Sequence, residues 1–556
     1  MAGRVWDWDE MNADSLETSK EWLERHAGLA AVILTALGFL ARVWTASGTF
    51  LSPDEALHFR LANQDSLSLA YRMSLTASHP PLLTLLLYYW RWLGTSELWL
   101  RMPSVIAGAT FCWMFYKWLS STAGTLAGLI GLLFVAFLQP IILLAAEVRQ
   151  YALLLVFLVS ALYCLDEAFA KRSQLFMAAF ALLLYLAFLS HYSAFLFAAA
   201  LGVYALIRIF AERTPVRVAA VWAIGQVGAM GLALLLYKSH ISKLGVGESR
   251  TALQGWMSEF FLSHSYFDPA QDRRIPFLFG HTFGVFQYFF GQLAVGDVMG
   301  VLFAAGVVVL LQGKGCPTER ASARRLGLLI LLLFSVAAGV SLAHVYPYGG
   351  TRHVAFLIVP GIAGVSVAIA SFAGQKWRRG AAIAALILIA CVAFGRPRRP
   401  SMSRANQRQA HMKDMMEFVK NNVAPSDVIF TDYMSDLIVG HYLCRQQPIS
   451  FETSNPEFEA FKCGHQVVSA GYRAGTLFTQ DNFVELWKRL VEVYRMEPCN
   501  TVWVMQAGWD VDLADDLRRD YSEFHDLQIE SFGKNIKIFK MTVGQPIPSI
   551  AQNARP

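Results

Sequence analysis

The stretch AGLAAVILTALGFLARVWTA, residues 27–46, decides the fold of this chain. Arg42 is its only charged side chain, and a helix of this length crosses a hydrocarbon layer of about 30 Å. Further apolar runs follow at residues 101–119, 125–144, 151–169, 175–189, 192–209, 218–237, 293–311, 326–344, 353–372 and 381–394. We therefore predict a mainly α protein whose polytopic helical membrane domain has about eleven spans.

The composition agrees with this prediction. Of 556 residues, 55% are hydrophobic and 16% charged, and the mean hydropathy of +0.40 is too high for a soluble globular protein. The formal net charge of +6 comes from basic residues in short loops, so nucleic-acid binding is not expected. Residues 1–26 are mixed in charge and show no cleavable signal, so we predict a cytoplasmic N-terminal segment and a retained first helix.

The loop charges fix the predicted orientation. Residues 80–93 are apolar but short and begin with prolines, so we interpret them as a juxtamembrane or re-entrant segment. With the N-terminus inside, the basic residues then collect in one set of loops, which is the cytoplasmic set. These residues are Lys117, Lys171, Arg172, Arg213, Arg217, Lys314, Arg320, Arg324, Arg325, Lys376, Arg378 and Arg379.

The unusual polar motifs fall in the opposite set of loops. They are SPDEALHF (52–59), SHPPL (78–82), EVRQY (147–151), SHY (190–192), the segment 238–281 and YPYGGTRH (346–353). Ionisable groups at membrane depth are costly and are usually functional, so their gathering at one face predicts a functional site there. The membrane domain would cover residues 27–396, with outer loops 47–100 and 238–292.

Residues 397–556 have a different character, because the apolar runs shorten and charges return. A helix is predicted at 404–422, a strand at 427–432, helices at 435–442 and 482–495, and a strand at 501–505, which together indicate a small soluble α/β domain outside the membrane. The cysteines show no metal-binding spacing. One pair among Cys444, Cys463 and Cys499 could form a disulfide if this domain is extracytoplasmic, and the sequence does not decide whether it does.

Two neighbouring acids follow the first span. A carboxylate at Asp54 or Glu55 reaches the membrane surface while staying hydrated, which suits a general base. Neighbouring side chains on a helix point about 100° apart, so one would act and the other orient. The alternative is a solvated loop or a helix start, because Ser52-Pro53-Asp54-Glu55 is also a good N-terminal capping sequence.

Cationic and hydrogen-bonding groups come from four further points of the chain. The fork of donors on Arg149 matches phosphate oxygens, although Glu147 and Arg149 also suit a plain helix-end pair. Each of the other groups alone is typical of an interfacial anchor. Together they predict recognition of a phosphorylated lipid headgroup. They are His79, His191, Arg352 and His353, the last two at the start of a predicted helix whose N–H groups favour an anion.

The order of these motifs resembles the GT-C class of integral-membrane glycosyltransferases, in particular the branch of lipid A aminoarabinose transferases and protein O-mannosyltransferases. The resemblance rests on Asp54-Glu55, His-Pro-Pro-Leu at 79–82, RMPSVIAG at 101–108, Glu-x-Arg-x-Tyr at 147–151 and His191-Tyr192. His79 stands where relatives often have Lys, and Val148 and Gln150 depart from the commoner Glu-Ala-Arg-Pro-Tyr.

The resemblance implies an inverting, metal-independent transfer of a sugar from a polyprenyl monophosphate to a lipid, glycan or protein acceptor, without a cofactor. Asp54 would be the base, with Glu55 beside it. Donor binding would fall to His79, Glu147, Arg149, Tyr151, His191, Tyr192, Tyr346, Arg352 and His353. The segment 238–281 resembles a loop that closes over the donor, with Lys243, His264, Arg273 and Arg274 as candidates. The implied location is a bacterial inner membrane with the site on the periplasmic face.

Two other functions remain open at this stage. A transporter or flippase of lipid-linked substrates also needs intramembrane charges, but it usually has broken helices in two related halves, and no such repeat is evident. A metal-dependent oligosaccharide transferase needs clustered oxygen ligands, which Asp54, Asp65 and Glu147 supply only if the fold brings them together.

Overall fold

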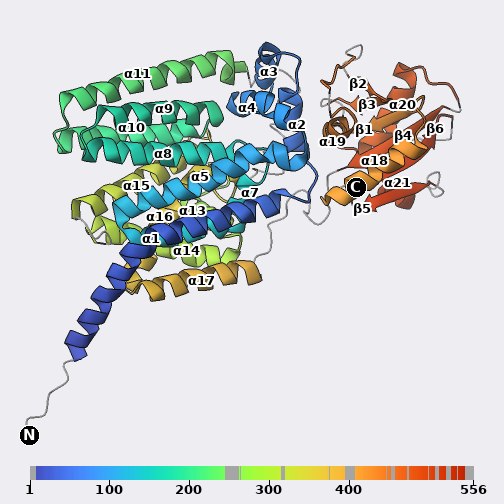
Figure 1. The fold of residues 1–556 in the computed structure, drawn as a ribbon. Helices are drawn as coiled ribbons and strands as arrows, with labels where there is room; N and C mark the ends of the chain where they lie inside the picture. Colours follow the sequence, from blue (N-terminus) through green and yellow to red (C-terminus); the bar gives the residue numbers. More distant parts are fainter. Residues whose placement is uncertain are drawn as a thin grey trace, which may run out of the picture.

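The structure is a computed structural model, and it describes most of the chain. The described residues are 8–243, 262, 264–314, 320–374, 376–394, 407–445, 447–452, 457–471, 475–498, 500–507, 512–520, 527–534 and 536–544. They form a bundle of long helices with a smaller α/β domain at one end, as predicted (Figure 1). Helix α1 begins at the opposite end of the bundle and projects from it.

The bundle is built from α1 and the apolar helices that follow it. Helix α16 lies at its centre, since nearly all of its residues are buried. Gly306 in α14 lies so close to α16 that a Cβ added to it would be 2.1 Å from the Gly364 carbonyl oxygen. The bounds are α1 (Trp8–Ala46), α5 (Glu97–Ala123), α6 (Thr125–Phe137), α7 (Gln139–Ala145), α8 (Tyr151–Ala170), α9 (Gln174–Ser190), α10 (Ala194–Ala211), α11 (Val216–Ser239), α13 (Arg274–Phe290), α14 (Leu293–Leu311), α15 (Arg320–Leu342), α16 (Ile358–Ala373) and α17 (Trp377–Phe394), with the short η2 (Ile241–Lys243) and η4 (Arg352–Leu357).

The protein is an integral membrane protein with fewer clear spans than the eleven predicted. In the described ranges, eight helices are long and apolar enough to cross a membrane, or nine if one bent pair counts as a span. That pair is α6 and α7, which replace the predicted straight run 125–144 and meet at 66°. Pro140 opens α7, and a proline there cannot continue the hydrogen-bond ladder of α6.

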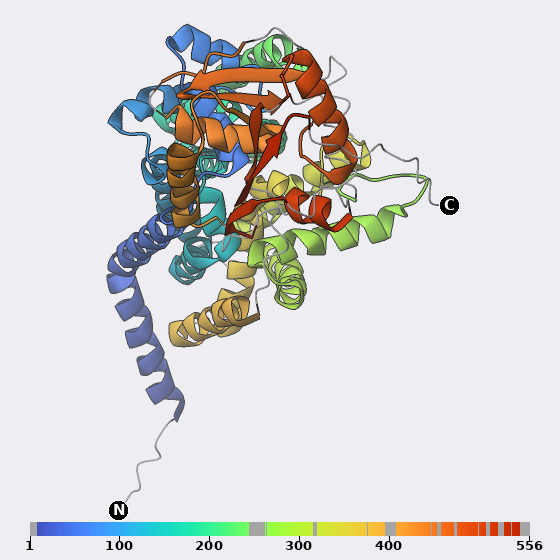
Figure 2. The same ribbon diagram turned by 90° about the vertical axis from the view of Figure 1, so that its right-hand side faces the viewer.

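The predicted outer loop 238–292 contains a helix that was not predicted from the sequence. Its last third forms α13, a helix of 17 residues that pairs with α14. In Figure 2 the light green α13 runs across the view, whereas several other helices of the bundle are seen nearly end-on. A single glycine, Gly291 in the left-handed conformation, ends α13 before α14 begins at Leu293.

Short helices occupy the end of the bundle nearest the α/β domain (Figure 1). They are α2 (Pro53–Ala62), α3 (Leu67–Ser74), α4 (Leu82–Trp90) and η1 (Arg91–Leu93). Helix α4 falls in the segment predicted to be juxtamembrane and is too short to span.

The α/β domain has a six-stranded mixed sheet in the order β2-β3-β1-β4-β6-β5. Strand β1 pairs in parallel with β3 and β4, and the outer pairs are antiparallel. The prediction found β1, β4 and the helices α18, α19 and α20, and missed the rest. The elements are α18 (Gln409–Asn422), β1 (Val428–Thr431), α19 (Tyr433–Leu443), β2 (Phe458–Cys463), β3 (His465–Ala470), α20 (Gln480–Val493), β4 (Thr501–Ala507), α21 (Leu513–Asp520), β5 (Ile529–Gly533) and β6 (Ile536–Thr542).

A disulfide joins Cys444, which follows α19, to Cys463 at the end of β2. The two cysteines are the first two of the three that the sequence offered as possible partners. Cys499 lies outside the described residues.

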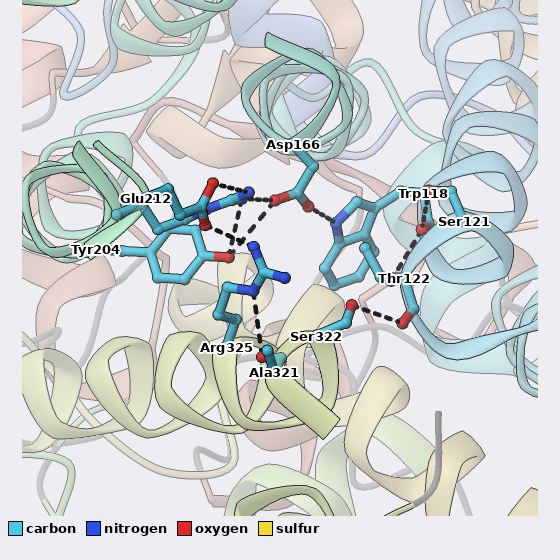
Figure 3. A network of polar contacts seen from close by, with 10 residues as sticks. Trp118, Ser121, Thr122, Asp166, Tyr204, Glu212, Ala321, Ser322 and Arg325 are labelled. Atoms are coloured by element: carbon cyan, nitrogen blue, oxygen red, sulfur yellow. Dashed lines mark hydrogen bonds and ion pairs between the residues drawn. The ribbon is translucent and has the colours of Figure 1, made fainter. Parts of the chain in front are cut away.

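A polar network ties the helices together at the far end of the bundle (Figure 3). Asp166 in α8 accepts hydrogen bonds from Trp118 in α5, at 3.0 Å, and from Arg208 in α10, at 2.5 Å. Arg208 also donates to Glu212, which in turn accepts from Arg325 of α15. Four helices are therefore fixed to one another at the end where the basic loops gather.

Candidate functional site

Helix α2 begins with a complete N-terminal cap. The Ser52 hydroxyl accepts from the Glu55 N–H, the Glu55 carboxylate accepts from the Ser52 N–H at 2.9 Å, and Pro53 takes a first-turn position that needs no donor. The capping alternative from the sequence is therefore correct for Glu55. It does not exclude a second use for Asp54.

Glu55 is turned into the protein and is held on both oxygens. Arg101 of α5 donates to them at 2.7 and 2.9 Å, and the Val148 N–H donates to Oε1 at 2.9 Å. Burial acts against the charge, but these donors, Arg101 first, lower the pKa of Glu55. The side chains of Arg101 and Glu55 are each 2% exposed, so Glu55 is placed to orient the chain rather than to contact a substrate.

Asp54 faces the other way, toward two guanidinium groups. Arg149 and Arg352 both donate to its Oδ2, Arg352 at 3.3 Å. Burial raises the pKa of Asp54, and the two arginines more than offset this and lower it from 3.8 to about 2. Its side chain is 39% exposed, and Oδ1 receives no hydrogen bond from the described residues, so this oxygen can meet a hydroxyl.

The two arginines reach Asp54 from distant parts of the chain. Arg149 lies in the break between α7 and α8, where its N–H donates to the Glu147 carbonyl and its carbonyl accepts from the Ser104 hydroxyl at 3.0 Å. Arg352 opens η4, which leads into α16, so the predicted helix starts as a 3-10 turn. Arg149 is 5% exposed and Arg352 41%, which leaves Arg352 open to an incoming anion.

A row of imidazole rings lies beside this centre. The ring centroids of His58 and His79 are 5.8 Å apart, those of His79 and His191 are 5.6 Å apart, and the Tyr151 ring follows at 5.3 Å. Burial and Arg149 lower the pKa of His58 and of His191 to about 3, and burial lowers that of His79 as well. The three rings are neutral near pH 7, so each offers one N–H donor.

Most of the predicted site residues come together at this point. His353 and Glu147 are within electrostatic range of Arg352, and the Tyr346 hydroxyl donates to the His353 carbonyl at 3.1 Å. Tyr192 lies to one side, where its hydroxyl bonds to His240, and the other ring nitrogen of that histidine contacts the Ala77 carbonyl at 2.6 Å.

The four loop candidates do not contact this centre in the part of the chain that the structure describes. Lys243 ends η2 and is exposed, and the neighbouring residues 244–261 lie outside the described ranges. The His264 carbonyl bonds to His281, and Arg273 and Arg274 stand exposed at the start of α13.

Three contributors were missed by sequence reasoning. His58 lies one helical turn after Asp54 in the quoted motif, and its i, i+4 spacing was the available signal. Arg101 was noted only as part of a motif, and His240 had no local signal, since its role depends on a partner 48 residues away.

The arrangement can hold an anion between two guanidinium groups beside an ionised carboxylate. Arginine forks match phosphate oxygens, and a short row of neutral N–H donors adds hydrogen bonds without further charge. Within the described residues, no three His, Cys, Asp or Glu side chains form a group that could hold a metal ion, so Asp54, Asp65 and Glu147 are not gathered as the oligosaccharide-transferase alternative required.

The long helical bundle, the short helices at one end and the α/β domain beyond them form a GT-C-like fold. The predicted fold class is therefore confirmed.

Two solved structures of membrane transferases are similar to this fold. ArnT from Cupriavidus metallidurans, in a crystal structure bound to undecaprenyl phosphate, is similar over 93% of this chain and 99% of its own, with a TM-score of 0.50 and 13% sequence identity. The archaeal oligosaccharyltransferase AglB from Archaeoglobus fulgidus, in complex with an inhibitory peptide and a dolichol-phosphate, matches over 87% of this chain and 70% of its own, with a TM-score of 0.45 and 11% identity. No protein-family model and no curated protein matches the sequence.

Proposed function

We propose that this chain is a membrane glycosyltransferase that moves a sugar from a polyprenyl-phosphate donor to a lipid, glycan or protein acceptor. The observation that carries the proposal is the Asp54 carboxylate bound by Arg149 and Arg352 at the end of the bundle nearest the α/β domain. The fold shared with ArnT, whose structure contains undecaprenyl phosphate, supports a lipid phosphate as the ligand of the arginines.

In the proposed reaction Asp54 accepts the proton of the acceptor hydroxyl. The acceptor oxygen forms a bond to the anomeric carbon on the face opposite the phosphate, and the bond between that carbon and the phosphate oxygen breaks, which inverts the configuration. Arg149 and Arg352 stabilise the charge of the departing polyprenyl phosphate. A phosphate is a good leaving group, so the site needs one base and several cations rather than a general acid.

Donor binding would also adjust the base. A carboxylate whose pKa is held near 2 by two arginines is a weak proton acceptor. A phosphate between Arg149 and Arg352 would share their donors and add negative charge, which makes Asp54 more basic when the donor is present. The neutral His79 would contact the phosphate or the sugar through one N–H group, in place of the lysine common in relatives.

Transport is the second candidate, and the distribution of charge argues against it. Transporters usually bind substrate near the bilayer midplane, at discontinuous helices of two related halves. Here the Asp54 centre lies at one end of the bundle, and the ion-paired network of Asp166 and Arg208 lies near the C-terminal ends of α8 and α10, at the other.

The proposed location is a bacterial inner membrane, with Asp54 on the periplasmic side and the basic loops in the cytoplasm. The proposed donor lipid and the acceptor would then both reach the site from the outer leaflet or the periplasm. No cofactor is proposed, and a divalent metal is left to the experiment below.

The test uses the purified full-length chain in lipid nanodiscs with a panel of polyprenyl-phosphate sugars and a mixture of lipid acceptors. Consumption of one donor, with release of free polyprenyl phosphate and a new glycosidic product seen by mass spectrometry, supports the proposal. Consumption of none, together with movement of intact donor across proteoliposomes, supports transport instead. A parallel arm with a chelator checks for a metal: complete loss of transfer, restored by adding a divalent cation, would contradict the metal-independent mechanism.

A further inference from the structure

Helix α2 carries Asp54 at its start and contacts the α/β domain at its end. At the start, Glu55 is fixed by Arg101 of the bundle. At the end, Arg60 donates to both carboxylate oxygens of Asp436, at 2.9 and 3.1 Å, and to the Asp436 carbonyl at 2.9 Å. The helix that presents Asp54 is therefore held by both parts of the protein.

The contact at the end of α2 is closely packed. Asp436 is completely buried and Arg60 is 10% exposed. The guanidinium lies over the Phe451 ring, 5.2 Å from its centroid, and the Phe59 ring meets the edge of His441 at 5.0 Å. A Cβ added to Gly440 would come within 2.8 Å of an Arg60 nitrogen, so the guanidinium group is tightly packed against α19.

A short helix needs such contacts to keep its direction. Helix α2 has 10 residues, fewer than the roughly 12–15 that an isolated helix needs to be stable in water. Its orientation therefore depends on tertiary contacts, and the Asp54 bonds to Arg149 and Arg352 depend on that orientation. Asn63, just past α2, adds one further link by donating to the Gln447 carbonyl at 3.0 Å.

We propose that Arg60 and Asp436 are positioning residues, through which the α/β domain holds α2 and keeps the Asp54 carboxylate against Arg149 and Arg352. The expected effect of this ion pair on turnover depends on the proposed sugar transfer being correct. Its expected effect on the stability and orientation of α2 does not. The α/β domain thereby contributes to the site by holding the helix that carries Asp54.

The test replaces both charges at once, in the variant Arg60→Met with Asp436→Leu. Removing one partner would leave a buried charge unpaired and could unfold the protein, whereas apolar residues of similar size in both places preserve packing. The matched control is Arg445→Met, which breaks another contact between the same two parts, at the Thr95 carbonyl and Glu97, and leaves α2 untouched.

Two readouts are measured on each protein. Hydrogen exchange of the amides in residues 56–62 should be about tenfold faster or more in the double variant, with α5 and α8 unchanged. Transfer should lose about 10- to 100-fold in kcat with little change in KM for the donor, because the arginines remain and only the base is displaced. Arg445→Met should stay within about twofold of wild type in both readouts.

The outcomes separate the two proposals. Unchanged exchange in α2, or faster exchange with wild-type kcat, overturns the positioning role. A wild-type protein that consumes no donor refutes the proposed transfer, and in that case the exchange of α2 alone decides whether Arg60 and Asp436 hold the helix. An equal loss of kcat in Arg445→Met would show that general loosening of the two parts, and not α2, is responsible.

Discussion

Arg101 forks onto both oxygens of Glu55, one residue away from Asp54, and each side chain of the pair is 2% exposed. The same arginine donates to the carbonyls of Ala46, Thr49 and Phe50, so it fixes the whole link between α1 and α2. The two adjacent acids thus have different roles: the Glu55 carboxylate is buried against Arg101, and the Asp54 carboxylate faces the site.

Removing Arg101 should destabilise the protein strongly. Arg101→Met leaves the buried Glu55 charge without its main partner, and we expect a loss of about 3–5 kcal/mol in the free energy of unfolding. Denaturant titration of the nanodisc-bound protein measures it. The double variant Arg101→Met with Glu55→Leu should recover part of the loss. A single variant as stable as wild type would contradict the burial of this pair.

Replacing Asp54 should separate binding from turnover. Asp54→Asn keeps the shape of the side chain but cannot accept a proton, so we expect transfer to fall by about 10²- to 10⁴-fold. Polyprenyl phosphate should bind at least as tightly as to wild type, because the arginines lose a competing anion; a ligand-induced thermal shift measures this. Arg149→Met is the comparison, and it should lose the binding. Asp54→Asn with normal turnover would refute the role of the base.

The pH dependence of stability should report the same ion pairs. The folded pKa of Asp54 is depressed from 3.8 to about 2, so its stabilising effect is present above pH 3.8 and is lost as the pH falls toward 2. The difference in melting temperature between wild type and Asp54→Asn should be constant from pH 7 to about 5 and should narrow below about pH 4. A difference that widens on acidification would contradict the depressed pKa.

The disulfide between Cys444 and Cys463 should stabilise the α/β domain. The bridge closes a loop with a sequence separation of 19 residues, for which loop entropy gives about 3 kcal/mol. The variant with both cysteines changed to Ala should therefore melt earlier, and a reductant should lower the wild-type melting temperature to the same value. A reductant that also lowers the melting temperature of this variant would point to a different cause.

The network at the far end of the bundle should affect stability without affecting donor binding. Arg208 is 7% exposed and joins Asp166 and Glu212, so Arg208→Met should cost about 3 kcal/mol or more. Arg149 and His191 directly precede α8 and α10, whereas Asp166 and Arg208 lie near the C-terminal ends of these helices, so the donor KM should stay unchanged. A raised KM would show that the two ends of the bundle are coupled.

The sequence predicted some parts of the fold well, and the misses have local reasons. The run 125–144 was predicted to be one span because its apolar residues continue past the bend between α6 and α7. Pro140, in the first turn of α7, was the available signal for this break. Helix α13 was hidden in a segment interpreted as polar, because Arg273 directly precedes it and Arg274 and His281 lie in its first two turns. Strand β5 is an edge strand with no fully buried residue, and in β6 the charged Lys537 and Lys540 interrupt the apolar pattern although most of the strand is buried.

The sequence by itself determined that the chain is a membrane protein, predicted that the polar motifs share one face, and offered a capped helix start at Pro53 as one alternative, because these properties depend on composition and on neighbours within one turn. Only the tertiary structure decided that Asp54 rather than Glu55 faces the site. Adjacent side chains on a helix diverge by about 100°, and the burial of one face depends on Arg101, Arg149 and Arg352, which approach from helices far away in the sequence.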